Sequence, residues 1–279
     1  GFAERNHISI YYDNDKMDTA RADRYGSFIA TFTIPESTAG RHKVLAVDDE
    51  DNEGEVTFKV TPEIDIDYDS GVVGTEVEIE GAGFRGRKYV TIYYDDKELD
   101  EVKTDRHGSF NTMVTIPEST VGEHKIKAVD TSSIRANTDF TVIPEIRLDY
   151  DSSVVGTEVK IEGTGFKGRD WVTIYYDGKE LDTQPASVRT DYYGSFAATF
   201  TIPESQAGEH EVKAVDASRA RETTDFSRTS ESNLNSSFGA VCEKVTIKGT
   251  GFKGGSAITI YYDDQRLNTN SPCVTSDCH

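Results

Sequence analysis

The sequence predicts an all-β protein of tandem antiparallel β-sandwiches, about seven strands each, forming an extended array. Three observations predict it: an internal repeat of about 82 residues, apolar residues that alternate with polar ones, and turn residues about every ten positions. No segment has the sustained 3.6-residue apolar stripe of an amphipathic helix. A repeat of this length suits a sandwich of seven short strands.

Two long motifs reveal the repeat. VTIYYDDKEL at Val90–Leu99 returns as VTIYYDGKEL at Val172–Leu181, and GTEVEIEGAGF at Gly74–Phe84 returns as GTEVKIEGTGF at Gly156–Phe166. Both spacings are 82 residues, and a four-residue insertion shortly after the second VTIYYD motif raises later spacings to 86.

This frame sets the expected domain boundaries. We expect an N-terminally incomplete repeat at 1–61, complete repeats at 62–143 and 144–229, the latter carrying the insertion, and the first half of a further repeat at 230–279. We therefore expect the chain to be a segment of a longer tandem array.

The strands of the repeat 62–143 are predicted in order from its apolar positions. They lie around Val77–Ile79, Val90–Tyr94, Phe110–Ile116, Ile126–Val129 and Phe140–Ile143. The turn signals GVVG, GRK, DDKELD, DRHG, IPEST-VG and DTSS separate them. Paired glycines such as Gly81 and Gly83 are expected to supply positive φ or a close backbone approach.

His42, His124 and His210 occupy equivalent positions in the first three repeats. Because they are a whole domain apart, they cannot converge on one metal or substrate. We expect each to have a structural role like the tyrosine of a tyrosine corner, with its polar tip bonded to nearby backbone.

Composition excludes several function classes. The 279 residues include 50 acidic and 30 basic ones, a formal net charge of −20. This charge argues against non-specific nucleic-acid binding, which needs cations to neutralise phosphates, and against docking on anionic lipid. No apolar run approaches 18 residues, so we expect no membrane span in this segment.

The segments GTEVEIEGAGF, VTIYYD, DRHGSF, TIPEST and GEHKIKAVD together resemble the IPT/TIG-type immunoglobulin-like repeats of prokaryotic surface proteins. The resemblance covers nearly the whole chain. It implies an immunoglobulin-like fold and an extracellular or cell-surface location. Because members of that family serve as stalks, adhesin spacers, surface-layer modules and accessory domains of enzymes, it does not choose among these functions.

Clustered aspartates are the candidate metal ligands. They are Asp65, Asp67 and Asp69 at the entry of the second repeat, and Asp149 and Asp151 at that of the third. Calcium takes six to eight oxygen ligands from several short loops, which domain junctions can bring together. The alternative is an acidic surface that only keeps a long array soluble.

The three cysteines, Cys242, Cys273 and Cys278, all fall in the last repeat. In an exported protein this favours a disulfide among them, with the pairing open. A haem c attached at Cys273 and Cys278 with His279 is an alternative, since the sequence is a longer variant of C-x-x-C-H. Asn235 opens the only N-glycosylation sequon.

Adjacent tyrosines recur once per repeat, as in Tyr93-Tyr94 and Tyr175-Tyr176. One ring of each pair faces the core and the other faces out. We expect Tyr94 and Tyr176 to contribute if the outward row binds glycan. No Gly-x-Ser-x-Gly, His-Glu-x-x-His or phosphate loop is present, so we expect no enzyme.

The function expected from these observations is structural. We expect a stalk, surface-layer or filament subunit that self-associates at a cell surface, with no cofactor required. An adhesin that binds glycan or protein through tyrosines and acidic loops is one alternative. A haem-bearing electron-transfer protein is another.

Overall fold

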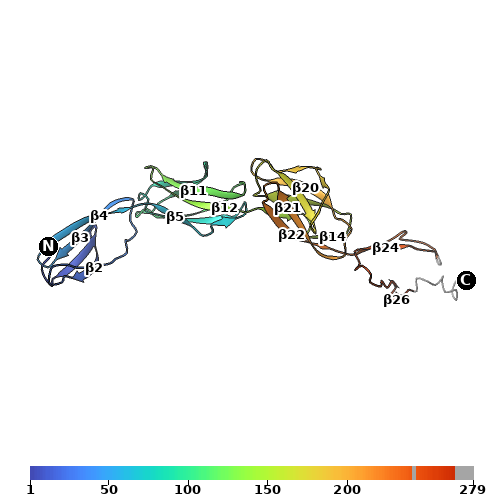
Figure 1. Cartoon of the computed structure of the whole chain (residues 1–279), viewed down its shortest axis with the longest axis horizontal. Coiled ribbons are helices and arrows are strands. Elements are labelled where there is room, and N and C mark those ends of the chain that lie inside the picture. Colours follow the sequence, from blue (N-terminus) through green and yellow to red (C-terminus); the bar gives the residue numbers. More distant parts are fainter. Residues whose placement is uncertain (241–242, 268–279) are drawn as a thin grey trace. The chain divides into compact units, whose positions relative to one another are not determined.

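The computed structural model describes residues 1–240 and 243–267, and in these residues every regular element is a β-strand (Figure 1). They form two compact units. One comprises Gly1–Pro117 and Gly122–Ile143, and the other comprises Glu118–Val121 and the described residues from Pro144 onward. The described part of the chain has no helix long and apolar enough to cross a membrane. The all-β fold class is confirmed.

The second repeat consists of two sheets packed face to face. The first sheet holds β5 (Glu63–Ile66), β7 (Glu76–Ala82) and β10 (Phe110–Thr115), in the order β10-β7-β5. The second holds β6 (Ser70–Gly71), β8 (Tyr89–Tyr94), β9 (Lys97–Lys103), β11 (Gly122–Asp130) and β12 (Arg135–Val142), in the order β6-β12-β11-β8-β9. This is an immunoglobulin-like β-sandwich.

The repeat has one strand more than the seven expected, because its first strand divides between the sheets. β5 pairs antiparallel with β7, and β6 pairs parallel with β12. Between them, Asp67 accepts a hydrogen bond from the Glu78 amide (2.9 Å), and the Thr141 amide donates to the Asp69 carbonyl oxygen (2.8 Å). These hydrogen bonds hold the segment between β5 and β6, where the chain passes from one sheet to the other.

The third repeat has the same plan. One sheet holds β13 (Glu145–Leu148), β15 (Glu158–Thr164), β18 (Thr183–Gln184) and β20 (Phe196–Thr201). The other holds β14 (Ser152–Ser153), β16 (Trp171–Tyr176), β17 (Lys179–Glu180), β19 (Val188–Arg189), β21 (Gly208–Asp216) and β22 (Arg221–Arg228). The four-residue insertion explains the difference from β9: the chain leaves β16, pairs briefly with β20 and returns to β16.

The first repeat has a single sheet of β1 (His7–Tyr12), β2 (Asp15–Arg21), β3 (Gly40–Asp48) and β4 (Glu53–Val60). Residues 28–33, at the phase of β10, form no strand, and the Ile29 side chain is 94% exposed. The last repeat has two hairpins, β23 (Glu231–Leu234) with β24 (Ile247–Thr250), and β25 (Tyr261–Tyr262) with β26 (Gln265–Arg266).

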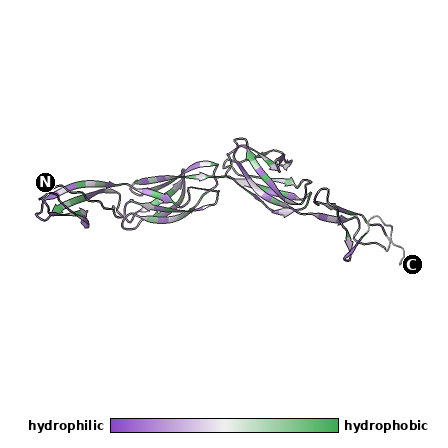
Figure 2. Cartoon of the chain, turned by 60° about the horizontal axis from the view of Figure 1, so that its bottom comes forward, coloured by the Kyte–Doolittle hydropathy of each residue, from purple (hydrophilic) through white to green (hydrophobic). Residues whose placement is uncertain are grey.

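The core of each complete repeat comes from the alternating apolar positions, visible as alternating green and purple bands along the strands in Figure 2. In the second repeat Val77, Ile79, Val90 and Ile92 are fully buried between the sheets. A two-residue period brings every second side chain of a strand to the same face, so the sequence pattern alone selects the buried set.

Glycine on the central strand of the smaller sheet makes room for an aromatic ring. A Cβ on Gly81 would lie 2.1 Å from the Phe110 ring, and one on Gly163 would lie 2.1 Å from the Phe196 ring. Each ring packs beside a second, fully buried phenylalanine, Phe84 or Phe166 (ring centroids 5.4 and 5.3 Å apart). The expected close backbone approach is therefore present at both glycines.

Replacing Gly163 by alanine should destabilise the third repeat by about 1–3 kcal/mol, because the added methyl group overpacks the core against Phe196. The measurement is urea unfolding of the full chain followed by circular dichroism. Glu162→Ala, at an exposed position on the same strand, is the control and should change the unfolding free energy by less than about 0.5 kcal/mol. Equal effects of the two variants would contradict the packing argument.

Candidate functional site

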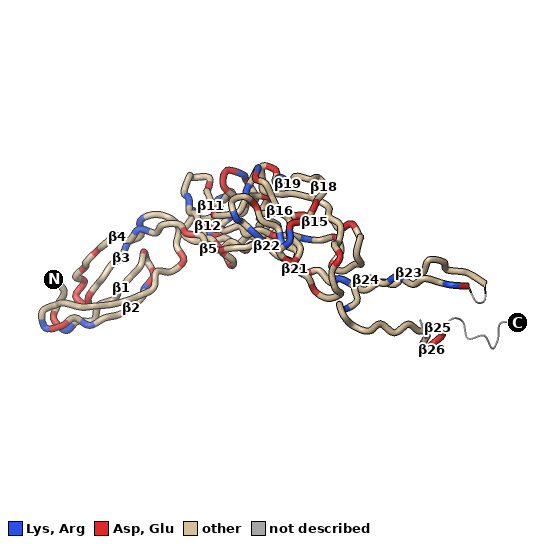
Figure 3. Tube along the Cα trace, turned by 45° about the vertical axis from the view of Figure 1, so that its right-hand side comes forward, with Lys and Arg blue, Asp and Glu red and all other residues tan. Residues whose placement is uncertain are grey.

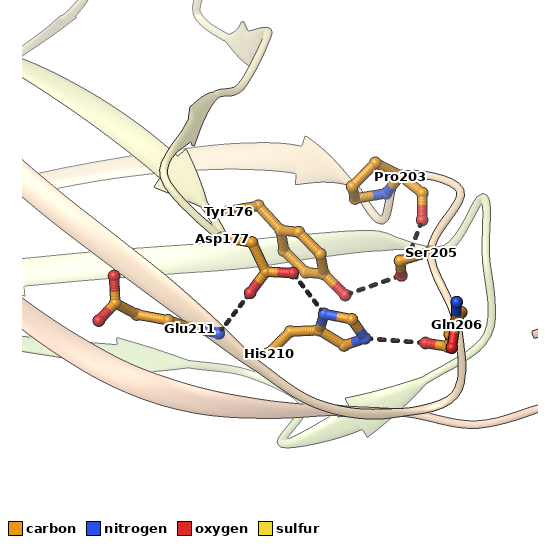
Figure 4. A network of polar contacts seen from close by, with 7 residues as sticks. All are labelled: Tyr176, Asp177, Pro203, Ser205, Gln206, His210 and Glu211. Carbon is orange, nitrogen blue, oxygen red and sulfur yellow. Dashed lines mark hydrogen bonds and ion pairs between the residues drawn. The ribbon is translucent and has the colours of Figure 1, made fainter. Parts of the chain in front are cut away.

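The most organised polar arrangement is a contact between histidine and aspartate that recurs in three repeats. We call it the His–Asp clasp, made of His42 with Asp13, His124 with Asp95, and His210 with Asp177. In these pairs the imidazole Nδ1 lies 2.8, 2.9 and 2.6 Å from a carboxylate oxygen. Figure 4 shows the third clasp, with the ring of His210 between Asp177 and the loop that carries Gln206.

The other ring nitrogen meets the backbone of that loop. His42 Nε2 lies 2.7 Å from the Thr38 carbonyl oxygen, and His210 Nε2 lies 2.8 Å from that of Gln206. Each acceptor is four residues before its histidine. The expected structural role, with a polar tip bonded to nearby backbone, is thus confirmed for these two histidines.

Both ring nitrogens of His42 and His210 therefore face oxygen atoms that only accept hydrogen bonds. A neutral imidazole donates from one nitrogen alone, whereas an imidazolium donates from both. At His42 the geometry accordingly suits the protonated ring, paired with an ionised Asp13. The histidine side chains are largely buried, while their aspartate partners remain about half exposed.

A buried tyrosine supports each histidine ring. The rings of Tyr12, Tyr94 and Tyr176 stack on those of His42, His124 and His210, with centroids 5.1, 5.1 and 4.9 Å apart. In the third repeat the Tyr176 hydroxyl also lies 3.2 Å from the Ser205 hydroxyl (Figure 4). Stacking leaves the histidine little freedom to rotate away from its aspartate.

The aspartate is held by an unusual backbone conformation. Asp13, Asp95 and Asp177 have φ of 51°, 51° and 48°, in the left-handed region that aspartate tolerates better than most residues. The second oxygen of each carboxylate accepts an amide hydrogen bond from the residue after the histidine, at 2.9–3.1 Å. One carboxylate thereby joins a hairpin turn to the neighbouring strand.

The pKa values in the first clasp follow from these contacts. Burial alone would lower the pKa of His42, but its hydrogen bonds to Asp13 and Thr38 and the charge of Asp13 outweigh burial and raise it above 6.5. The hydrogen bond from His42 lowers the pKa of the Asp13 carboxyl. Each partner therefore favours the charged form of the other.

The outward tyrosines are the other members of the pairs. Tyr94 and Tyr176, which we expected to take part in glycan binding, are each only 3% exposed, so that expectation is wrong for these two rings. Tyr93 and Tyr175 face outward, with the ammonium groups of Lys127 and Lys213 4.9 and 5.4 Å from the ring centroids. Tyr94 lies two residues after Ile92, and Tyr176 two residues after Ile174, so the alternation of each strand already places these two rings on the buried face.

The structure does not gather the aspartates proposed for calcium into one group. Asp67 and Asp149 each accept a backbone amide of the next strand, from Glu78 and Lys160, and Asp65 lies opposite Glu80 in the sheet. The backbones of Asp69 and Asp151 pair with the last strand of their repeat. No three His, Cys, Asp or Glu side chains within residues 1–240 and 243–267 are placed to hold a metal ion. Calcium binding stays a prediction.

The remaining sequence candidates lie in the last repeat. Cys242, Cys273, Cys278 and His279 are outside the described residues. Asn235 is exposed, and its side-chain oxygen accepts a hydrogen bond from the Thr246 amide (2.7 Å).

No known family model matches the chain, and no curated protein matches its sequence. Solved structures match parts of it, at low identity. A beta-glycosidase from Bacteroides vulgatus shares 10% identity over 60% of this chain and 25% of its own, with a TM-score of 0.26. A Bacteroides ovatus protein of a mixed-linkage glucan utilization locus, solved with a mixed-linkage heptasaccharide, shares 12% over 83% and 63%, with a TM-score of 0.31. A Yersinia pseudotuberculosis adhesin shares 12% over 60% and 58%, with a TM-score of 0.28. At these values the likeness carries no argument about function.

The His42–Asp13 clasp should make the stability of the first repeat depend on pH. Because the folded pKa of His42 is raised, its contribution of about 1 kcal/mol is complete below about pH 6.5 and is lost as pH rises through the folded pKa. The measurement is urea unfolding of wild type and His42→Gln across pH. The difference between them should be largest at mildly acidic pH and should shrink toward alkaline pH. His7→Gln, at an exposed histidine, is the control. A difference that is constant with pH would contradict the charged clasp.

For the cysteines we expect one disulfide. The intact mass of the chain should be two hydrogen masses below that of the reduced chain, with no Soret absorbance. A Soret band that survives denaturation would instead establish covalent haem at Cys273 and Cys278.

Proposed function

We propose that the chain is a structural, non-enzymatic segment of an extracellular or cell-surface protein, in which tandem immunoglobulin-like repeats act as a stiff spacer. We further propose that the repeats are of the IPT/TIG type, which the repeat motifs support. The observation that carries the proposal is the close joining of consecutive repeats within each compact unit.

In the first unit, β4 of one repeat ends at Val60 and β5 of the next begins at Glu63, so only Thr61 and Pro62 lie between them. The backbone of Gly83 packs against this connection. A Cβ on Gly83 would lie 2.8 Å from the Thr61 carbonyl oxygen and 3.2 Å from Pro62 Cα. Proline restricts φ, and a packed two-residue connection leaves few conformations.

A hydrogen bond also joins the two repeats. The Ala39 amide donates to the Phe84 carbonyl oxygen (3.0 Å). The residue before Ala39 is Thr38, whose carbonyl oxygen is the acceptor for His42. The clasp therefore immobilises the loop that makes the contact between repeats.

The second unit repeats this arrangement between the third and fourth repeats. The Ala207 amide donates to the Gly251 carbonyl oxygen (2.7 Å), and the preceding residue, Gln206, is the acceptor for His210. A Cβ on Gly251 would lie 1.9 Å from a guanidinium nitrogen of Arg228, which is 2% exposed. Only glycine fits beside this arginine.

The surface charge suits a spacer. The complete repeat 62–143 has 17 acidic and 9 basic residues, a net charge of −8, and acidic residues (red in Figure 3) are spread over the trace of both units. Like charge on every repeat keeps closely similar domains from associating through their strand edges. Self-association into a surface array, which we also propose, then requires specific contacts.

The test of stiffness is a distance measurement between spin labels on two consecutive repeats. The full chain carries Thr57→Cys and Glu101→Cys, both at exposed positions, with the three native cysteines replaced by serine. We expect a narrow distance distribution by double electron–electron resonance. Inserting four glycines after Thr61 should broaden it at least about twofold, because the end-to-end distance of a flexible linker varies widely.

The control is the same insertion after Thr229, which occupies the position equivalent to Thr61 two connections further along the chain and should leave this distribution unchanged. A distribution that is already broad in the parent chain would contradict the stiff spacer. For location, protease treatment of intact source cells should release peptides of this chain, and their absence would contradict a surface role.

A further inference from the structure

Basic and aromatic residues gather at one end of each of the first three repeats. In the third repeat they are Arg169, Trp171, Arg189, Tyr192 and Tyr193, which we call the basic–aromatic cluster. The same phases hold Arg87, Tyr89, Lys103, Arg106 and His107 in the second repeat, and Arg5, His7, Arg21, Arg24 and Tyr25 in the first. They come from two turns and the strand ends beside them, so they are far apart in sequence.

The cluster of the third repeat is one continuous row. The Arg189 guanidinium lies 5.4 Å from the Trp171 ring centroid, and its Nε donates to the Arg169 carbonyl oxygen (3.1 Å). The Arg169 guanidinium lies 5.2 Å from the Tyr192 ring, which meets Tyr193 edge to face. Trp171 is 55% exposed and Tyr192 is 64% exposed. Large aromatic faces of this kind are costly to leave in water.

The first arginine of the cluster stands where the backbone favours glycine. Arg5, Arg87 and Arg169 have φ of 58°, 60° and 58°. In the fourth repeat the same phase holds Gly255, with φ of 74°. A non-glycine residue in this conformation is less favourable than glycine, because its Cβ lies close to the following carbonyl oxygen. Three repeats bear that cost and keep a guanidinium, which indicates a use for the side chain itself.

These cations have no carboxylate partner in the described part of the chain, although acidic residues greatly outnumber basic ones. None of Arg5, Arg87 and Arg169 makes an ion pair or a side-chain hydrogen bond among the described residues. In the adjacent turns, one carboxylate oxygen of Asp105 and one of Asp191 accept backbone amides two and four residues further on. The guanidinium groups remain available to an external anion.

We propose that the basic–aromatic cluster binds an anionic saccharide, with sugar carboxylates on the guanidinium groups and pyranose rings on the faces of Trp171 and Tyr192. One acidic sugar presents both a carboxylate and an apolar C–H face. The row places two arginines between a tryptophan and two tyrosines, so one such sugar can meet both kinds of group. Guanidinium and carboxylate form two parallel charge-assisted hydrogen bonds. A dense polyanion such as nucleic acid is disfavoured by the charge of −20.

The test is affinity electrophoresis of the full chain in gels that contain polygalacturonate, dextran sulfate or neutral dextran. The proposal expects retardation by polygalacturonate and none by neutral dextran. The triple variant Arg5→Gly, Arg87→Gly, Arg169→Gly should bind polygalacturonate at least about tenfold more weakly, since each variant position loses a charge-assisted hydrogen bond to a sugar carboxylate. Glycine relieves the backbone at these positions, so weakened binding cannot be attributed to unfolding.

Trp171→Ala should weaken binding to polygalacturonate, because the proposal places a pyranose ring on the exposed indole face. The matched controls are Arg147→Gln, whose arginine pairs with Glu145, and Tyr150→Ala, at another exposed tyrosine, and both should bind like wild type. Unchanged binding in the triple variant would overturn the proposal. Equal binding of polygalacturonate with or without Trp171, or binding of an acidic peptide or oligonucleotide but not polygalacturonate, would also overturn it. The proposal goes beyond the spacer function, whose distance measurement these outcomes leave untouched.

Discussion

The contact between a histidine ring and an aspartate in a left-handed turn organises one end of each repeat. It joins the turn that carries Asp13 to the strand that carries His42, 29 residues later, and to the loop at Thr38 that leads into that strand. Because both ring nitrogens are engaged and a tyrosine stacks on the ring, the loop has one favoured position. The adjacent amide of Ala39 then meets the next repeat in a fixed direction. The ion pair of the clasp and the contact between consecutive repeats thus both depend on the histidine side chain.

This dependence distinguishes the chain from domains tethered by free linkers. A two-residue connection limits motion through chain length, but a hydrogen bond and a glycine-lined contact limit it through packing. The arrangement is found within both compact units, with Arg228 replacing valine at the end of the third repeat. The charge of the remaining surface then acts over longer distances, between repeats and between molecules.

Much of the fold followed from the sequence because alternation and turn residues are local signals. The strands around Val77, Val90 and Ile126 lie where the apolar period places them.

Features that depend on which segments pair or contact each other in space were not predictable in this way. The first strand of each complete repeat divides because its two halves pair with different sheets. The recurrence of His42 was visible, but its charge depends on Asp13, 29 residues away. The basic–aromatic cluster was missed because its members are scattered over two turns, although the recurrence of Arg5, Arg87 and Arg169 in the repeat frame was a usable signal.

The closure of each clasp within a single repeat has a consequence for how such a protein changes over time. A repeat brings its own core, its own clasp and its own half of each contact with a neighbour. Duplication or loss of one repeat of about 82 residues therefore changes the length of the chain by one complete domain. No existing core is disturbed by such a change. Length becomes a quantity that recombination can adjust independently of stability, while substitutions confined to the end of one repeat adjust what that repeat contacts.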